Sequence, residues 1–252
     1  IGEKIGPLFR SKKIITSNLE QAFPKITSKE IDAFAQNMWS NYGRIFSDYM
    51  FIKNFRKTES KNYIELEGKE ILEKIKNSSK PVVFVSAHFD NFELMAMQIE
   101  KSGVKLAALY RPLNNIFLNP LMEKIRKKYI CKYQVKKGLS GVKELLKLFK
   151  DGYSIALMID QRVSEGINVK FFNKEALTTT IPAQFVKKFG CNIVPVYIER
   201  LKSSNFKIKF FSPLIFSEKC EVEEITLKIN KNLEEMIKIK PVQWIWSHNR
   251  WK

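Results

Sequence analysis

The residue pair best suited to chemistry is a histidine and a glutamate five positions apart. His88 directly follows an apolar run, and Glu93 ends the segment His-Phe-Asp-Asn-Phe-Glu. Residues at this spacing do not face each other along a helix or a strand, so His88 must lie on a turn and Glu93 in the first helical turn. A carboxylate bonded to one imidazole nitrogen fixes the tautomer and leaves the other nitrogen free to accept a proton. The spacing therefore suggests a general-base pair that activates a hydroxyl.

The same segment also has purely structural interpretations. Short motifs often arise by chance, and His88 would then be a buried histidine with its hydrogen bonds satisfied, beside a helix-capping Glu93. Asp90 is a competing partner for His88, or the N-cap of the following helix. Ser86 is the nearest alternative nucleophile, and we interpret it as structural.

The elements that must position these residues alternate between strand and helix. The apolar run 81–87 predicts a buried strand. Further strands are expected at 104–110, 154–159, 193–198 and 206–211, with helices at 91–101, 116–129, 140–150, 180–189 and 222–238 and a polar loop at 160–180. This alternation predicts an α/β fold with a mostly parallel central sheet flanked by helices. Sites in such sheets gather at the carboxyl ends of the strands.

Further polar residues follow strands of the predicted sheet. Arg111 closes the second strand, so we expect it beside the end of the first, holding an acidic group or an oxyanion; a surface ion pair is the alternative. Asn114 suits a turn or a substrate contact. Asp160 and Gln161 end the third strand. We expect Asp160 to orient Arg111 or Arg126 or to bind the acceptor, with a strand-ending turn as the alternative.

The first part of the chain predicts a helical arm. We expect a single domain (1–252) composed of this arm, residues 1–66, and an α/β core, residues 67–252. Thr27 and Glu30 have the spacing of a capping box. The helix that follows carries apolar residues every three to four positions from Ile31 to Tyr49. We expect this face to pack on the core, with contact to lipid as the alternative.

The composition points to an anionic partner. The chain has 252 residues, with 44 Lys and Arg against 26 Asp and Glu, a net charge of +18. Nucleic acid, an anionic membrane or an acidic protein would suit this excess. Three cysteines without metal-binding spacing and only two histidines argue against a zinc site and for a reducing compartment. No run reaches the roughly 18 apolar residues of a membrane-spanning helix. Because the chain begins with Ile1, we expect that a natural N-terminal segment is missing.

A basic run concentrates this charge. It contains no acid and comprises Lys124, Arg126, Lys127, Lys128, Lys132, Lys136 and Lys137. The run indicates a solvated face, a nucleic-acid patch or, as the better fit, a surface that meets an anionic membrane or an acidic protein.

Several blocks together resemble one known family. The segment 88–93 resembles the His-x-x-x-x-Asp/Glu box of glycerolipid acyltransferases, and more closely that of the bacterial lipid A late acyltransferases, the lauroyl- and myristoyltransferases. Further blocks resemble that family in its order, at 18–24, 110–112, 119–121, 158–161, 171–173, 178–179 and 241–250. Together they form a far more specific signal than any one block alone.

The resemblance implies a glycerolipid-acyltransferase-like fold and a specific reaction. A fatty acyl chain would pass from an acyl carrier protein or coenzyme A thioester to a hydroxyl of a lipid A precursor or related glycolipid. His88 would be the base and Glu93 would stabilise its imidazolium, without an acyl-enzyme. Arg126 matches an arginine that supports substrate binding. The candidate substrate-binding residues are then Arg111, Asn114, Arg126, Asp160 and Gln161.

The resemblance also implies a location and partners. We expect a peripheral protein on the cytoplasmic face of the bacterial inner membrane, in contact with its anionic surface and lacking the family's usual N-terminal anchor. No metal, cofactor or nucleic-acid partner is expected. Two alternatives remain open: a different phospho-, glyco- or aminolipid acceptor, and a non-enzymatic basic protein that binds membrane or nucleic acid.

The chain departs from the family's usual box at two positions, where Asp90 replaces Gly and Phe92 replaces Trp. An extra carboxylate at Asp90 would raise the pKa of His88 or reflect a different acceptor. Candidate walls for the acyl chain, or plain core residues, are Phe89, Phe92, Met95 and Phe117. The C-terminal tryptophans suit a lipid interface or packing, and His248 is not expected to be catalytic.

Overall fold

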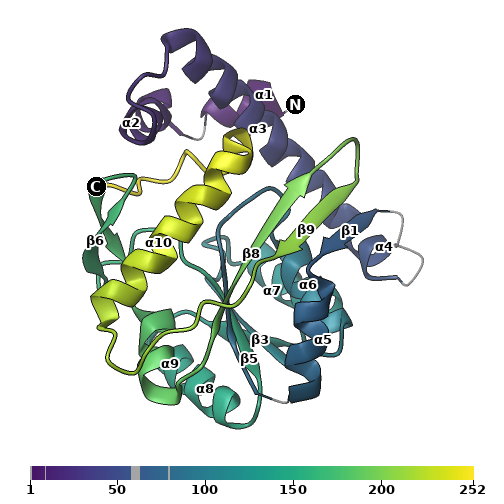
Figure 1. Ribbon diagram of the computed structural model, residues 1–252. Helices are drawn as coiled ribbons and strands as arrows, with labels where there is room; N and C mark the ends of the chain where they lie inside the picture. Colours follow the sequence, from purple (N-terminus) through teal and green to yellow (C-terminus); the bar gives the residue numbers. More distant parts are fainter. Residues whose placement is uncertain (1, 9, 58–62, 79) are drawn as a thin grey trace.

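The central sheet contains most of the strands. The computed structural model describes residues 2–8, 10–57, 63–78 and 80–252 (Figure 1). The described strands are β1 (Ile64–Glu67), β2 (Val83–Ser86), β3 (Leu106–Tyr110), β4 (Tyr133–Lys136), β5 (Ser154–Met158), β6 (Ile167–Phe171), β7 (Lys174–Thr178), β8 (Ile193–Arg200) and β9 (Phe206–Phe210). The sheet has the order β1-β9-β8-β2-β5-β3-β4, and its neighbours run parallel except β8 with β9. The expected α/β fold with a mostly parallel sheet is confirmed.

Helices connect the strands and precede them. The described helices are α1 (Gly2–Ile5), α2 (Lys12–Ala22), α3 (Ser28–Met50), α4 (Ile52–Arg56), α5 (Lys69–Ser78), α6 (Glu93–Lys101), α7 (Leu118–Ile125), α8 (Leu139–Lys150), α9 (Ile181–Phe189) and α10 (Val222–Ile239). Short 3-10 or π turns are η1 (Gly6–Leu8), η3 (Arg126–Ile130) and η4 (Pro241–Gln243).

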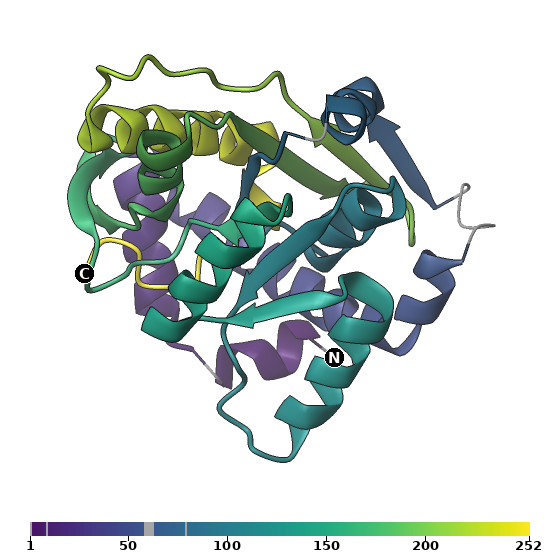
Figure 2. The ribbon, with the colours of Figure 1, turned by 90° about the horizontal axis from the view of Figure 1, so that it is seen from below.

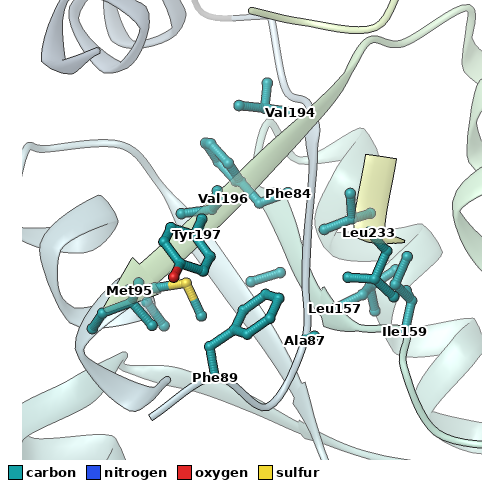
Figure 3. Packing of buried hydrophobic residues seen from close by; sticks show 14 of the residues in the cluster. Phe84, Ala87, Phe89, Met95, Leu157, Ile159, Val194, Val196, Tyr197 and Leu233 are labelled. Carbon is teal, nitrogen blue, oxygen red and sulfur yellow. The ribbon is translucent and has the colours of Figure 1, made fainter. Parts of the chain in front are cut away.

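The core lies on both faces of the sheet. Helices α8, α9 and α10 cover one face and α6 the other (Figure 2). Strand β2 is buried along its whole length, because both of its faces are covered. Figure 3 shows Phe84 of β2, Val194 of β8 and Leu233 of α10 within this packing. Burial of this kind fixes the carboxyl end of β2, where His88 follows.

Strand order determines which side chains meet at that end. We expected the end of β3, with Arg111, beside the end of β2, but β5 lies between them. The expectation was wrong because it assumed that strands adjacent in the sequence are adjacent in the sheet. The crossover from β2 to β3 passes over one strand position. Ser86 of β2 pairs in register with Met158 of β5. Two residues further along each strand, His88 and Asp160 are therefore level with each other.

Some strands lie where the sequence suggested none. The expected polar loop contains the antiparallel hairpin β6–β7, whose turn residues Phe172 and Asn173 have φ of 50° and 60°. Positive φ at both positions is the geometry of a tight hairpin turn. Strand β1 begins at Ile64, so the expected boundary at 66–67 falls inside a strand of the sheet. Strand β4 occupies the end of the basic run.

Helices α1 to α4 precede the sheet in the chain (Figure 1). The capping box of Thr27 and Glu30 is present at the start of α3. Ile31 and Met38 are buried, whereas Phe46 near the other end of α3 is exposed. The apolar face therefore packs on the core over only part of its length. Among the residues that the structure describes, no helix has both the length and the apolar character needed to cross a bilayer.

Candidate active site

His88 is held in place by the end of β5. Its Nδ1 lies 2.8 Å from Oδ1 of Asp160, and its backbone N–H donates to Oδ2 of the same carboxylate at 2.9 Å. The carboxylate thereby orients both the ring and the backbone of the histidine. The His88 side chain is 21% exposed and borders a cavity, and no hydrogen bond to Nε2 exists among the described residues. This nitrogen is free to act on a bound molecule.

Asp160 is itself fixed within the core. Its side chain is fully buried, and Oδ2 also accepts a hydrogen bond of 2.9 Å from the indole N–H of Trp244. Burial alone would raise the pKa of Asp160, but the His88 ring and these hydrogen bonds lower it below its usual value. The side chain is thus a carboxylate at neutral pH, as a partner of an imidazole must be.

The interaction with Asp160 raises the pKa of His88. Burial alone would lower that pKa, but the charge and hydrogen bond of Asp160, with the nearby charge of Glu93, outweigh burial. Asp160 therefore favours the imidazolium form and would stabilise the charge that develops when Nε2 accepts a proton.

Glu93 does not occupy the expected place at His88. Its Oε1 accepts hydrogen bonds from Nε of Arg126 at 2.8 Å and from the Tyr49 hydroxyl, and it lies 2.6 Å from Nη2 of Arg126. The expected hydrogen bond between Glu93 and His88 is wrong. The parallel neighbour β5 places Asp160 at Nδ1 of His88, the position that Glu93 was expected to occupy. Asp160, in turn, orients His88 and neither of the arginines that we had considered.

Arg126 lines the cavity and has a buried donor without a partner in the described part of the chain. Its side chain is largely buried, and Nη1 has no hydrogen-bond partner among the described residues. The pair with Glu93 fixes the plane of the guanidinium. A buried donor without an acceptor costs free energy, which makes Nη1 of Arg126 a candidate for a role in binding.

The sequence-predicted residues converge on one cavity. Its volume is about 390 Å³, and its polar lining residues include His88, Glu93, Arg111, Asn114, Arg126 and Gln161. Asp160 lies behind His88 and completes the set. The apolar part of the wall includes Ala96, Ala108, Ile130, Ala156, Leu157 and Ile181. A cavity with a polar cluster and an apolar wall suits an amphipathic ligand. No side-chain group suited to a metal ion exists among the described residues.

The expected acyl-chain walls are mostly elsewhere. Phe92 lines the cavity and packs its edge against the His88 ring, with centroids 4.7 Å apart. Phe89 and Met95 are buried in the core (Figure 3). Phe117 is 83% exposed and does not border the cavity. Ser86 is buried and donates to Val196 O at 2.6 Å, in agreement with a structural role.

Asp90 faces away from His88. Its carboxylate binds Arg200, with Oδ1 2.8 Å from Nη2, and Arg200 also binds Asp48 at 2.6 Å. Asp90 has φ of 33°, a left-handed conformation that Gly, Asn and Asp tolerate best. The residue that resembles a family glycine thus fits the same backbone turn, and its charge is used in a buried ion cluster. It neither pairs with His88 nor caps α6.

Two residues that the sequence analysis missed hold site side chains in place, Tyr49 and Trp244. Tyr49 lies on the apolar face of α3, and nothing in its spacing distinguishes it from a core aromatic residue. Trp244 was expected at an interface or in packing; it is buried, and its N–H binds Asp160. An isolated β-bridge between Trp244 and Phe89 joins the C-terminal segment to the turn after β2.

The chain was compared with family models, curated proteins and solved structures. The model of the family described as bacterial lipid A biosynthesis acyltransferase matches residues 1–252. The chain is 22% identical to lipid A biosynthesis acyltransferase 2 of Shigella flexneri, over 98% of this chain and 79% of that protein. It is 23% identical to the lipid A biosynthesis lauroyltransferase of Escherichia coli K12, over 96% of this chain and 79% of that protein. The solved structure of the 1-acyl-sn-glycerophosphate acyltransferase PlsC from Thermotoga maritima aligns with a TM-score of 0.42 at 15% identity, covering 91% of this chain and 95% of that one.

Proposed function

This chain belongs to the bacterial lipid A biosynthesis acyltransferase family, and we propose that it transfers a fatty acyl chain from a carrier thioester to a hydroxyl of a lipid A precursor or related glycolipid. Acyl carrier protein is the proposed donor, with coenzyme A as the alternative. The proposed location is peripheral, on the cytoplasmic face of the inner membrane. The observation that carries the proposal is the 2.8 Å contact between His88 Nδ1 and Asp160, which leaves Nε2 free beside the cavity.

The proposed chemistry begins with proton removal. Nε2 of His88 accepts the proton of the acceptor hydroxyl while its oxygen attacks the thioester carbonyl carbon. Asp160 stabilises the imidazolium that forms, without taking the proton itself. When the tetrahedral intermediate collapses, the carbon–sulfur bond breaks and the thiolate takes the proton back from Nε2. The products are an ester and a free carrier thiol.

Arg126 is the proposed oxyanion donor. Its unpartnered Nη1 would donate to the carbonyl oxygen as negative charge develops there. Glu93 acts through Arg126 by fixing the guanidinium plane with a 2.8 Å hydrogen bond. In this assignment Glu93 is a positioning residue, and its Oε1 binds both Arg126 and Tyr49.

Polar residues at the rim are proposed to recognise the acceptor. Arg111 and Asn114 are exposed residues that line the cavity, and Gln161 lines it beside Asp160. A guanidinium at this position suits a phosphate or carboxylate of a glycolipid headgroup.

A direct transfer without an acyl-enzyme fits the positions of Ser86 and Cys131. The Ser86 hydroxyl is buried and donates to a backbone oxygen. Cys131 is buried, and burial raises the pKa of its thiol to about 12, so it is not a thiolate at neutral pH. Neither side chain borders the cavity.

The test is an acyl-transfer assay with detergent-solubilised lipid A precursor. Acyl carrier protein and coenzyme A thioesters of several chain lengths are the donors, and wild type is compared with His88→Ala. We expect product from wild type and a loss of about 10³-fold or more in the variant, which circular dichroism should show to be folded. Folded wild type that transfers to no lipid A precursor would overturn the proposed acceptor, and other phospho-, glyco- and aminolipids would then be tested.

A further inference from the structure

A segment next to the active site exposes large apolar side chains. It follows β3 and includes the start of α7; we call residues 113–121 the apolar tip. Its exposed apolar residues are Leu113, Ile116, Phe117, Leu118 and Leu121. Phe117 is 83% exposed, which is unusual for a phenylalanine in water. Clustered exposed apolar side chains of this size mark an interaction surface.

The apolar tip projects from the rest of the molecule. Helix α7 and the loop before it form the lower edge of the view in Figure 2, beyond the sheet. All of α7 lies within the described residues, and none of its side chains is buried. Packing on this chain therefore does not account for the apolar residues of the tip.

Basic side chains begin about one helical turn after the end of the tip and about two turns after Phe117. Phe117, Leu121 and Lys124 are spaced for one face of α7. The rise from Phe117 to Lys124 is about 10 Å, close to the depth to which interfacial helices bury their apolar residues. Lys124 would thus lie at the headgroup level of a bilayer that the tip enters. Further exposed lysines in this region are Lys127, Lys128, Lys132, Lys136 and Lys137.

Acidic charge near the tip is already neutralised. Glu123 is the one acidic residue between positions 111 and 137. It accepts a hydrogen bond from Asn119 at 2.8 Å and lies 3.4 Å from Lys136. This stretch of the chain therefore carries a strong excess of positive charge, which complements anionic phospholipid headgroups.

The apolar tip is continuous with the rim of the cavity. Arg111, Pro112, Leu113 and Asn114 line the cavity, and the exposed tip residues follow directly in the chain. Insertion of the tip into a bilayer would place the cavity mouth at the membrane surface. An amphipathic lipid could then reach His88 without crossing water.

We propose that the apolar tip and the lysines of α7 and η3 dock this enzyme on an anionic lipid bilayer, with Phe117 and Leu121 inserted. A second copy of the chain is a poorer occupant, because two such basic faces repel each other. An acidic protein would pair with the lysines but would leave the apolar tip without a partner. The benefit for lipid delivery rests on the proposed function, whereas docking itself does not require acyl transfer.

The test is co-sedimentation with vesicles in the absence of any acyl donor. Vesicles of equal parts phosphatidylcholine and phosphatidylglycerol are compared with pure phosphatidylcholine. We expect wild type to bind the anionic vesicles, and Phe117→Ser/Leu121→Ser to bind at least about tenfold more weakly. Lys124→Gln/Lys128→Gln should weaken binding to anionic vesicles and reduce its dependence on salt. Ile215→Ser is the matched control, since Ile215 is equally exposed but lies on the loop between β9 and α10.

The remaining outcomes are equally decisive. His88→Ala should bind vesicles as wild type does, so that loss of transfer and loss of docking are separate results. Equal binding by Ile215→Ser and Phe117→Ser/Leu121→Ser would overturn the proposal. So would wild type that ignores anionic vesicles, or that forms dimers which the tip substitutions dissociate.

Discussion

Catalysis by His88 should depend on Asp160 more than on the carboxylates that are close to His88 in the sequence. Asp160→Asn keeps the shape of the side chain but removes the charge that stabilises an imidazolium. We expect kcat to fall by about 10²–10⁴-fold, with little change in folding. The measurement is steady-state transfer with circular dichroism as the check on folding. Asp151→Asn, at the exposed end of α8, is the matched control and should retain full activity. Full activity in Asp160→Asn would contradict the assignment.

The pH dependence of transfer should report the same pair. The base must be unprotonated, and Asp160 raises the pKa of His88, so activity should rise with pH through a midpoint above the usual histidine value of about 6.5. In Asp160→Asn the burial of His88 remains while the stabilising charge is gone. The midpoint should then move to lower pH, even though the maximal rate falls. A pH–kcat/KM profile measures this, and an unmoved midpoint would exclude the pair as its source.

Tyr49 should act through Glu93 and Arg126. Burial and the charge of Glu93 raise the pKa of Tyr49, so the phenol stays protonated and donates to Glu93. Tyr49→Phe removes that donor without emptying the space. We expect kcat to fall about tenfold at unchanged KM, because Arg126 is oriented less well toward the oxyanion. A change in KM alone, or in stability alone, would indicate a merely structural tyrosine.

At the scale of elements, β8, α3 and the turn after β2 are joined by a buried ion cluster. Arg200 on β8 binds Asp48 on α3 and Asp90 on the turn, and it stacks over Phe206 with its guanidinium carbon 4.4 Å from the ring centroid. Arg200→Met would leave two buried carboxylates without their cation. We expect the free energy of unfolding to fall by about 3–5 kcal/mol in urea titrations.

A surface ion pair provides the contrast for this cluster. Lys238 and Glu235 are exposed and 2.8 Å apart, so Lys238→Met should change the free energy of unfolding by less than about 1 kcal/mol. Adding Asp48→Asn and Asp90→Asn to Arg200→Met should restore part of the lost free energy of unfolding, because the two unpaired buried carboxylate charges are then removed. A single variant Arg200→Met with a loss under about 1 kcal/mol would show that the cluster is not coupled to folding.

The positions of the strands show which features of the site sequence patterns can predict. Strand ends identified residues that the structure brings to one cavity, because carboxyl ends of parallel strands share an edge. Chain order could not show that β5 separates β2 from β3, and so Asp160 replaced Glu93 as the partner of His88. The β6–β7 hairpin was missed although Ile167, Val169 and Phe171 of β6 alternate with polar residues as in a strand; each of its strands is only five residues long.

The whole molecule couples its N-terminal arm to the site through polar side chains. Asn18 on α2 donates to the backbone oxygens of Trp246 and His248, each at 2.7 Å. Asp48 and Tyr49 at the end of α3 bind Arg200 and Glu93. These pairings span most of the sequence, and sequence patterns cannot predict them, because each polar residue lies within an apolar helix face.

This coupling predicts that the arm and the core unfold together. Asn18→Ala leaves two backbone oxygens in the C-terminal segment without their donor, which should cost about 1–3 kcal/mol of the free energy of unfolding. Far-UV circular dichroism and tryptophan fluorescence should give coincident urea transitions in wild type and in the variant, with only the midpoint lowered. Trp39 on α3 and Trp246 beside Asn18 place fluorescent reporters on both sides of the contact. Glu20→Ala, at an exposed position of α2, is the matched control and should leave the midpoint unchanged. Separate transitions for the two signals in wild type would mean that the arm folds independently of the site that Tyr49 enters.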